Sequence, residues 1–424
     1  MIYLGYAQCD ITPEDNMPLI GFYRKEEKSK GCLKPLLAQI SVWKDGNNKK
    51  SVLVTIDSLG FSKKQTDDLR VIVAEYIGTE KECVMICFSH THAAPDSSDS
   101  KYEYYDFVCR KINDAVKVAV SNMKAVNIGW ENVEADIGVN RRNTAADIDK
   151  RVGILKVCES DSKEIKLLIL RATAHGNSLK RDNLLISPDW FGAVREIVGE
   201  RYNCPVMMVQ GAAGNVAPKY FCSKETPVDA SGEKYVRSNN ALKDMAEVVL
   251  TALVPKVDNI NTSNLDVMDV YSKEITLTAP VPSIEDAEKI AYEANRFCGI
   301  DGTSWLKEIK ELHFNNITAQ YETVEVQFFM VGNWCLCGVP YEIMNEFAIR
   351  AAKDMNNPYF YFNGYTNGCL TYFPTEKEYD KGGYEVFWSL LIYYIYFDRV
   401  SAFEREACTK LIDFVVEVGN RTEV

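Results

Sequence analysis

Apolar runs of strand character alternate along the chain with longer segments of helical period. Runs rich in β-branched residues, such as KSVLVTID at 50–57 and ECVMICFS at 82–89, are typical of buried strands. Between them, segments such as 62–78 and 104–123 repeat their apolar positions at the spacing of a helix. The pattern predicts strands at 50–57, 82–89, 165–175, 205–211, 321–331 and 357–362, and helices at 62–78, 104–123, 188–202, 238–254, 284–298, 341–354 and 401–417.

This alternation predicts an α/β fold with mixed, largely buried β-sheets flanked by helices. We expect most strands to be parallel and helices to cover both faces, since near-continuous apolar strands are typical of such sheets. The turn-rich segment 211–237 is long for a loop, and long loops in compact domains tend to be functional. The stretch 254–266 is the best candidate for a linker, but nothing indicates that its two sides fold separately. Residues 1–424 are therefore expected to form one domain.

Composition narrows the classes of function. Hydrophobic residues make up 46% and charged residues 25% of the sequence, as is ordinary for a soluble globular protein. A formal net charge of −12 argues against nucleic acid as a partner, because no cluster of basic residues offers a surface for phosphate groups. The N-terminus lacks the basic and apolar regions of a secretory signal, and thirteen scattered cysteines indicate reduced thiols. We therefore expect a cytoplasmic protein.

One uncharged stretch, VFWSLLIYYIYF at 386–397, is almost entirely apolar. It is too short for a transmembrane helix, which needs roughly 20 apolar residues. The stretch is interpreted as a buried helix or as a contact between subunits of a homo-oligomer. Shallow contact with a membrane surface is the alternative.

Histidine is rare in this sequence, with four residues in all, yet three of them follow predicted strands. His90 and His92 come at the end of the strand at 82–89, and His175 ends the strand at 165–175. Residues two apart on a strand share a face, so His90 and His92 are expected to line one pocket. The alternative is a purely structural role, in which each histidine caps a strand by hydrogen bonding to a backbone carbonyl. A zinc site built on two histidines needs at least one oxygen ligand, and the pattern does not choose it among 60 carboxylates.

Eight short motifs occur in a fixed order along the chain. They are GYAQCDITP at 5–13, MPLIGFY at 17–23, SHTH at 89–92, Asn140–Arg141, HGNS at 175–178 with Asn183 and SPD at 187–189, GNVAPK at 214–219, PYE at 340–342, and the tail of Tyr372, Tyr379, Tyr384 and Glu385. In this order they resemble motifs of the neutral/alkaline non-lysosomal ceramidase family. The resemblance covers the catalytic domain, without a counterpart of the family's C-terminal immunoglobulin-like domain, and implies the fold of that domain.

The resemblance also implies roles for individual residues. The zinc ligands of the family fall on His90, His175, Glu342 and Tyr372. His92 corresponds to an active-site histidine beside the metal and is expected to carry protons with a pKa near neutrality. Arg141 is a candidate for holding a substrate carbonyl or carboxylate and, with Tyr372, for stabilising the oxyanion. Asp189 is either a structural cap or a partner of a histidine ligand.

Two positions depart from the family pattern. Ala217 stands where the family has its catalytic serine, and Asn215 replaces the aspartate two residues earlier. A step that depends on serine is lost, whereas metal chemistry survives. We therefore expect a zinc-dependent hydrolase of a carboxamide bond, acting on a small-molecule amide by direct attack of metal-bound water. A non-catalytic descendant that binds a metal or ligand, or a metal-dependent esterase, is the alternative. The sequence leaves the substrate, the oligomeric state and the physiological metal open.

Overall fold

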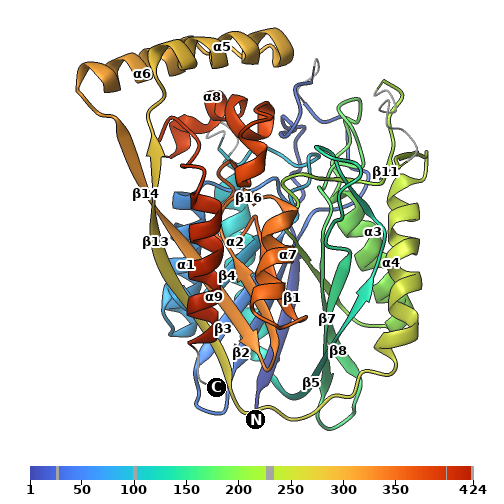
Figure 1. Ribbon diagram of the computed structural model, residues 1–424. Helices are drawn as coiled ribbons and strands as arrows, with labels where there is room; N and C mark the ends of the chain where they lie inside the picture. Colours follow the sequence, from blue (N-terminus) through green and yellow to red (C-terminus); the bar gives the residue numbers. More distant parts are fainter. Residues whose placement is uncertain (25–27, 99–102, 226–233, 398, 422–424) are drawn as a thin grey trace.

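Helices and sheets form four layers in the computed structural model, which describes residues 1–424 except 25–27, 99–102, 226–233, 398 and 422–424 (Figure 1). Helices cover the outer face of an eight-stranded sheet, and other helices cover the outer face of a four-stranded sheet. The inner faces of the two sheets share a third hydrophobic core. The predicted α/β class with mixed, largely buried sheets is confirmed.

The eight-stranded sheet has the strand order β4-β3-β2-β1-β5-β7-β8-β9. The outermost pairs, β3–β4 and β8–β9, are parallel, and every pair between them is antiparallel. The expectation of mostly parallel strands is therefore wrong. The reason is local: the turns at 45–49 and 160–164 are too short for a parallel crossover. The strands are β1 (Tyr3–Asp10), β2 (Leu37–Lys44), β3 (Lys50–Ile56), β4 (Val84–Phe88), β5 (Lys124–Glu134), β7 (Arg151–Glu159), β8 (Ile165–Ala172) and β9 (Val206–Gln210).

The outer face of this sheet packs on helices that follow its strands in the chain. On β3, Val52 and Val54 face the helices, while Leu53 between them faces the second sheet. Ser62 begins the first helix with a capping box, and Gly78 ends it in a left-handed conformation. The covering helices are α1 (Lys63–Ile77), α2 (Tyr104–Ser121), α3 (Asp189–Tyr202) and α4 (Ala241–Val257).

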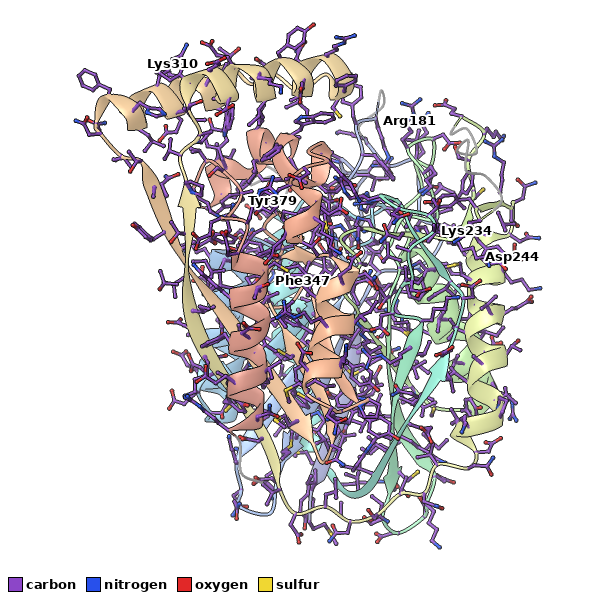
Figure 2. The ribbon with its side chains drawn as sticks, viewed as in Figure 1. Arg181, Lys234, Asp244, Lys310, Phe347 and Tyr379 are labelled. Atoms are coloured by element: carbon purple, nitrogen blue, oxygen red, sulfur yellow. The ribbon has the colours of Figure 1, made fainter. Side chains whose placement is uncertain are left out.

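The four-stranded sheet has the order β13-β14-β15-β17, and its last pair is parallel. One face packs against the eight-stranded sheet and the other against α7 and α9, where Phe347 lies among aromatic rings (Figure 2). Each sheet therefore has helices on one face, rather than on both faces as expected. The elements are β13 (Met268–Pro280), β14 (Ala319–Val331), β15 (Trp334–Gly338), β17 (Phe360–Asn363), α7 (Asn345–Asp354) and α9 (Ala407–Asn420).

The long antiparallel pair β13–β14 carries α5 (Ile284–Cys298) and α6 (Thr303–Phe314), which lie across one end of the molecule (Figure 1). The uncharged stretch 386–397 forms short helical turns, including α8 (Leu390–Tyr393), and packs against α5 and α6. Its Leu390 and Leu391 are buried, whereas Ile395 is exposed. Among the described residues, no helix is both long enough and apolar enough to cross a membrane.

The predicted linker 254–266 and the turn-rich segment 211–237 both contain regular structure. The start of 254–266 belongs to α4, and Ser263 further along pairs with Ile128 of β5. The segment 211–237 contains β10 (Val216–Pro218), β11 (Tyr220–Phe221) and β12 (Val236–Arg237), and its residues 226–233 lie outside the described part. All thirteen cysteines are free thiols.

A buried ion pair ties α1 to β14. The guanidinium of Arg70 donates hydrogen bonds of 2.7 and 2.8 Å to the two carboxylate oxygens of Glu325. Burial alone raises the pKa of Glu325, but the hydrogen bonds and charge of Arg70 outweigh it and lower the pKa from 4.5 to about 2. Because the folded-state pKa is depressed, the stabilisation is present above pH 4.5 and disappears as the pH falls toward 2.

We expect Glu325→Gln to lower the free energy of unfolding at pH 7 by roughly 3 kcal/mol. The difference from the wild type should shrink as the pH falls from about 4.5 to 2, as measured by urea unfolding across that range. Glu274→Gln, at an exposed position directly across the strand pair, is the matched control and should behave like the wild type. A difference between E325Q and wild type that is the same at every pH would contradict this account.

Candidate metal centre

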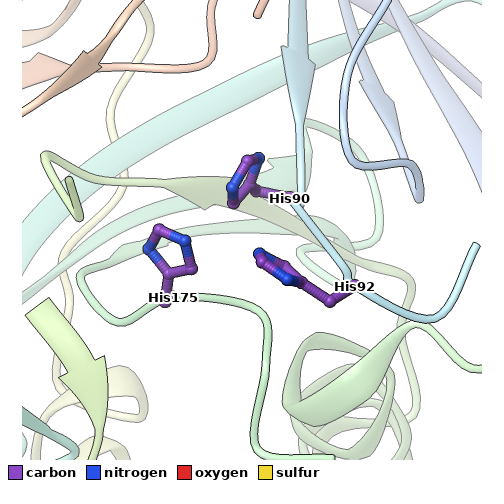
Figure 3. Close-up of side chains that lie close together, drawn as sticks. All are labelled: His90, His92 and His175. Atoms are coloured by element: carbon purple, nitrogen blue, oxygen red, sulfur yellow. The ribbon is translucent and has the colours of Figure 1, made fainter. Parts of the chain in front are cut away.

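Three histidines meet at the strand ends of the eight-stranded sheet. His90 and His92 follow β4, and His175 follows β8. All three are buried, and one ring nitrogen from each lies within 4.8 Å of the others (Figure 3). The ring centroids are 4.6 to 5.1 Å apart, and the rings point toward a common centre. His90 and His92 thus lie together as expected, and His175 joins them in one cluster.

The segments that carry the histidines are joined, although one follows the edge strand β4 and the other follows β8, next to the opposite edge strand β9. Gln210, at the end of β9, donates its side-chain amide to the carbonyls of Ser89 and Ala174. The backbone of His92 also donates a 2.9 Å hydrogen bond to the carbonyl of Gly176. The residues that precede and follow the histidines are thereby fixed to one another.

The conformation of His90 differs from the expectation of a strand. Its φ angle is +57°, in the left-handed region, so strand alternation does not explain why His90 and His92 share a pocket. The bend after β4 turns the chain so that both rings face the centre. For a residue other than glycine this conformation costs about 1–2 kcal/mol, which the surrounding contacts must offset.

Backbone carbonyls fix the orientation of two imidazole rings. The Nδ1 atom of His90 lies 2.6 Å from the carbonyl of Leu59, and that of His175 lies 2.9 Å from the carbonyl of Ala213. A carbonyl only accepts hydrogen bonds, so each Nδ1 carries a proton, and in the neutral ring each Nε2 then presents a lone pair. Both lone pairs face Glu342, whose Oε2 lies 3.3 Å from Nε2 of His90 and 3.5 Å from Nε2 of His175.

Burial keeps the imidazoles of His92 and His175 in the neutral form, the form that binds metal ions. Burial first, and then the charge of His90, lowers the pKa of His92 well below the usual range. Burial, and then the charge of Arg141, does the same for the pKa of His175. The pKa of His92 is thus lower than the near-neutral value that we expected.

The donor atoms of this cluster fit a metal ion. Both ring nitrogens of His92 and Nε2 of His175 are buried without a hydrogen-bond partner in the described part of the chain. Buried polar atoms that lack partners are costly, and an ion at the centre would give Nε2 of His175 a partner. Neutral imidazoles and a carboxylate are also the ligand types of zinc sites. The group of His90, His92 and His175 could therefore hold a metal ion.

Glu342 and Tyr372 are neighbours although they are far apart in sequence. They pair directly between the short parallel strands β16 (Glu342–Ile343) and β18 (Tyr372–Phe373). A Cβ atom at Gly214 would lie 2.4 Å from the carbonyl oxygen of Glu342, so glycine permits the close approach of this loop. Burial, and then the charge of Glu342, raises the pKa of Tyr372 well above its usual value. The structure thus brings the four predicted ligands to one region, while their role as ligands stays a prediction.

Arg141 holds the hydroxyl of Tyr372. Its Nη2 donates to that hydroxyl at 3.2 Å and to the carbonyl of Gly214 at 2.7 Å, while Nε lies 2.9 Å from Oε1 of Glu385. Burial by itself would lower the pKa of Arg141, but Tyr372, Glu385 and Glu342 raise it above its ordinary value. The guanidinium is therefore charged and already engaged by protein groups.

The two departures from the family pattern lie two residues apart in one short segment beside the site. Ala217 belongs to β10, which pairs with β6 (Gly138–Asn140), and its methyl group offers no hydrogen bond. The side chain of Asn215 donates to Glu346 at 2.9 Å and accepts from the backbone of Asn345 at 2.8 Å. These contacts give Asn215 a structural role.

Asp189 has a structural role and bonds backbone N–H groups rather than a histidine ring. Its carboxylate accepts hydrogen bonds from the backbone of Ser178, Leu179 and Trp190. Trp190 in turn donates its indole N–H to the carbonyl of His175 at 3.1 Å. Asp189 therefore fixes the loop that follows His175.

Sequence reasoning missed two residues that shape the site, Gln210 and Tyr365. Gln210 ends an apolar strand and belongs to no motif. Its contacts depend on the approach of β9 to the segment after β4, which the sequence does not reveal. The ring of Tyr365 lies 4.4 Å from that of His90, and its hydroxyl donates to Glu342 at 3.3 Å. Tyr365 sits in an irregular segment where hydrophobic periodicity gives no signal.

Comparisons with known proteins define the class of fold. No protein-family model matches the chain, and no curated protein matches it in sequence. The structure is similar to that of the neutral ceramidase from Pseudomonas aeruginosa, with a TM-score of 0.70 and 18% identity, over 100% of this chain and 75% of that one. A second solved structure, a ceramidase complexed with C2, matches with a TM-score of 0.73 and 16% identity over 99% and 75%. The chain therefore has a ceramidase-like fold, as expected.

Proposed function

We propose that this protein is a zinc-dependent hydrolase that cleaves a carboxamide (N-acyl) bond. The observation that carries the proposal is the convergence of Nε2 of His90, Nε2 of His175 and Oε2 of Glu342 at 3.3 and 3.5 Å. Carbonyls behind both rings fix the tautomers that such a site requires. The ceramidase-like fold supports hydrolysis of an amide rather than another reaction of a zinc enzyme.

His90, His175, Glu342 and Tyr372 would hold the zinc ion. When bound, zinc lowers the pKa of a water molecule to about 7 and polarises a carbonyl group. The four side chains supply two nitrogen and two oxygen donors, a set that zinc accepts. Arg141 keeps the hydroxyl of Tyr372 in place and offers positive charge beside it.

His92 would move the proton. Its ring lies 5.0 and 5.1 Å from those of His90 and His175, and it is neutral because burial lowers its pKa. A neutral imidazole with no partner on either nitrogen in the described part of the chain can accept a proton and pass it to the leaving amine. The ring centroid of Phe22 lies 4.7 Å from that of His92, and a Cβ atom added at Gly21 would collide with the His92 ring.

The fold and Ala217 support the proposed substrate class. Two solved structures similar to this one are ceramidases, which favours N-acyl amides as substrates. Ala217 has no hydroxyl to attack the carbonyl or to donate a hydrogen bond to the oxyanion. Losing one such donor costs ~10²–10³ in rate in other enzymes. We therefore propose a small N-acyl compound, cleaved without a covalent enzyme intermediate, in preference to long-chain ceramide.

A substrate panel tests the proposal. The zinc-loaded protein is incubated with ceramide in detergent and, in parallel, with small N-acyl compounds and matched esters. We expect at least one small amide to be cleaved faster than ceramide, without a burst of product that would signal an acyl-enzyme. Ceramide cleaved faster than every small amide would contradict the substrate class, and faster cleavage of the esters would indicate an esterase.

A protein that binds a ligand without turnover is the second candidate. Two residues favour it. Ala217 lacks the hydroxyl that the ceramidase family has at this position, and Asn215 replaces a carboxylate with an amide that is held by Glu346 and Asn345. Retention of His90, His175 and Glu342 around one centre argues for catalysis instead. Stoichiometric zinc without hydrolysis of any amide or ester would support the binding protein.

A further inference from the structure

We propose that Tyr365 is a positioning residue of the metal site, which holds the carboxylate of Glu342 against the two histidines. The inference rests on the proposed function, because Glu342 acts there as a ligand. The hydroxyl of Tyr365 donates to Oε2 of Glu342 at 3.3 Å, within a fully buried environment. This is the same oxygen that faces Nε2 of His90 and Nε2 of His175.

The ring of Tyr365 also packs against the ligands. Its centroid lies 4.4 Å from the ring of His90 and 6.2 Å from that of His175. One side chain thus restricts the carboxylate through its hydroxyl and an imidazole through its ring. Outer groups of this kind orient the ligands of metal sites, and their removal typically costs 10–100-fold in affinity.

The backbone fixes Tyr365 in an unusual conformation. Its φ angle is +54°, which is rare for a residue with a bulky side chain. The backbone N–H of Tyr365 donates to the carbonyl of Tyr341 at 3.1 Å, and its own carbonyl accepts from the backbone of Phe88 at 3.0 Å. Phe88 lies two residues before His90, and Tyr341 lies one residue before Glu342. Tyr365 therefore joins the chain segments that deliver both groups.

The neighbouring residues hold this bend from both sides. The side chain of Asn367 accepts from the backbone of Ile86 at 2.9 Å, while its own backbone donates to the carbonyl of Ile86 at 2.7 Å. A Cβ atom at Gly364 would lie 2.4 Å from the carbonyl oxygen of Tyr341. A strained conformation that the surroundings maintain in this way is typical of functional sites.

The test removes one oxygen atom. Tyr365→Phe keeps the ring and its packing but loses the hydrogen bond to Glu342. We expect a 10–100-fold increase in the dissociation constant for zinc, measured by competition with a chromophoric chelator. Tyr361→Phe is the matched control, because Tyr361 is equally buried and its hydroxyl bonds Asn132 at 2.5 Å instead. The control should stay within about threefold of wild type, the change expected if no outer group of the site is touched.

A double-mutant cycle separates positioning from general loss of structure. If Tyr365 acts through Glu342, adding Y365F to Glu342→Ala should leave zinc affinity unchanged. An equal loss in both backgrounds would overturn the inference, and so would a Y365F dissociation constant within threefold of wild type. A wild-type protein that binds no zinc would instead contradict the proposed function itself.

Discussion

Replacing His90 or His175 with alanine is expected to remove the zinc ion and with it the hydrolytic activity. Each ring offers an Nε2 lone pair whose direction is fixed by a backbone carbonyl behind Nδ1. Loss of an outer group typically costs 10–100-fold in metal affinity, so loss of a direct ligand should cost more than ~100-fold. Elemental analysis of purified protein should therefore give one zinc per chain for the wild type and a small fraction of that for either variant.

The fourth histidine supplies the control. His313 lies in α6, and its Nε2 atom is close to the carbonyl of Pro282 at 2.8 Å, apart from the cluster. His313→Ala should keep the zinc content and the activity of the wild type. Full retention of zinc by both His90→Ala and His175→Ala would refute the assignment of these residues as ligands.

His92→Ala should lower kcat by ~10²–10⁴ while the protein keeps its zinc, because positioned proton transfer contributes rate enhancements of that size. The buried imidazole has two ring nitrogens without partners in the described part of the chain, and it stands beside the rings of His90 and His175. In the proposed reaction its neutral form accepts a proton, and the imidazolium so formed donates that proton to the leaving amine. The measurement combines steady-state kinetics with zinc content on the same preparation.

The geometry gives this experiment two clear outcomes. The nitrogens of His92 are close enough to those of His90 and His175 for all three to reach one ion. If His92 were a ligand, H92A would lose zinc together with activity. If it carries the proton, as we propose, activity falls and the zinc content stays at one per chain.

Hydrophobic periodicity placed many elements but did not determine how they pair. The predicted strand at 50–57 and helix at 62–78 match β3 (Lys50–Ile56) and α1 (Lys63–Ile77) within a residue or two. The parallel arrangement was wrong because runs of buried apolar residues look alike in both directions. Burial of one face by a second sheet, instead of helices, likewise leaves no mark on the sequence of a strand.

Some residues of the candidate site could be predicted from their position in the sequence, and others could not. Position after a strand was enough to bring His90, His92 and His175 together as candidates. Glu342 and Tyr372 came from the resemblance alone, since their pairing between β16 and β18 depends on contacts between distant segments.

The central claim is that His90, His175, Glu342 and Tyr372 surround one zinc ion, and anomalous diffraction at the zinc edge tests it most directly. Crystals of the zinc-loaded protein should show a single peak ~2.0–2.2 Å from Nε2 of both histidines and from an oxygen of both Glu342 and Tyr372. His92 should stand beside the ion without binding it. A Tyr372 hydroxyl more than roughly 5 Å from the ion, well beyond the ~2 Å of a ligand, or an ion held by His92 in its place, would contradict the account.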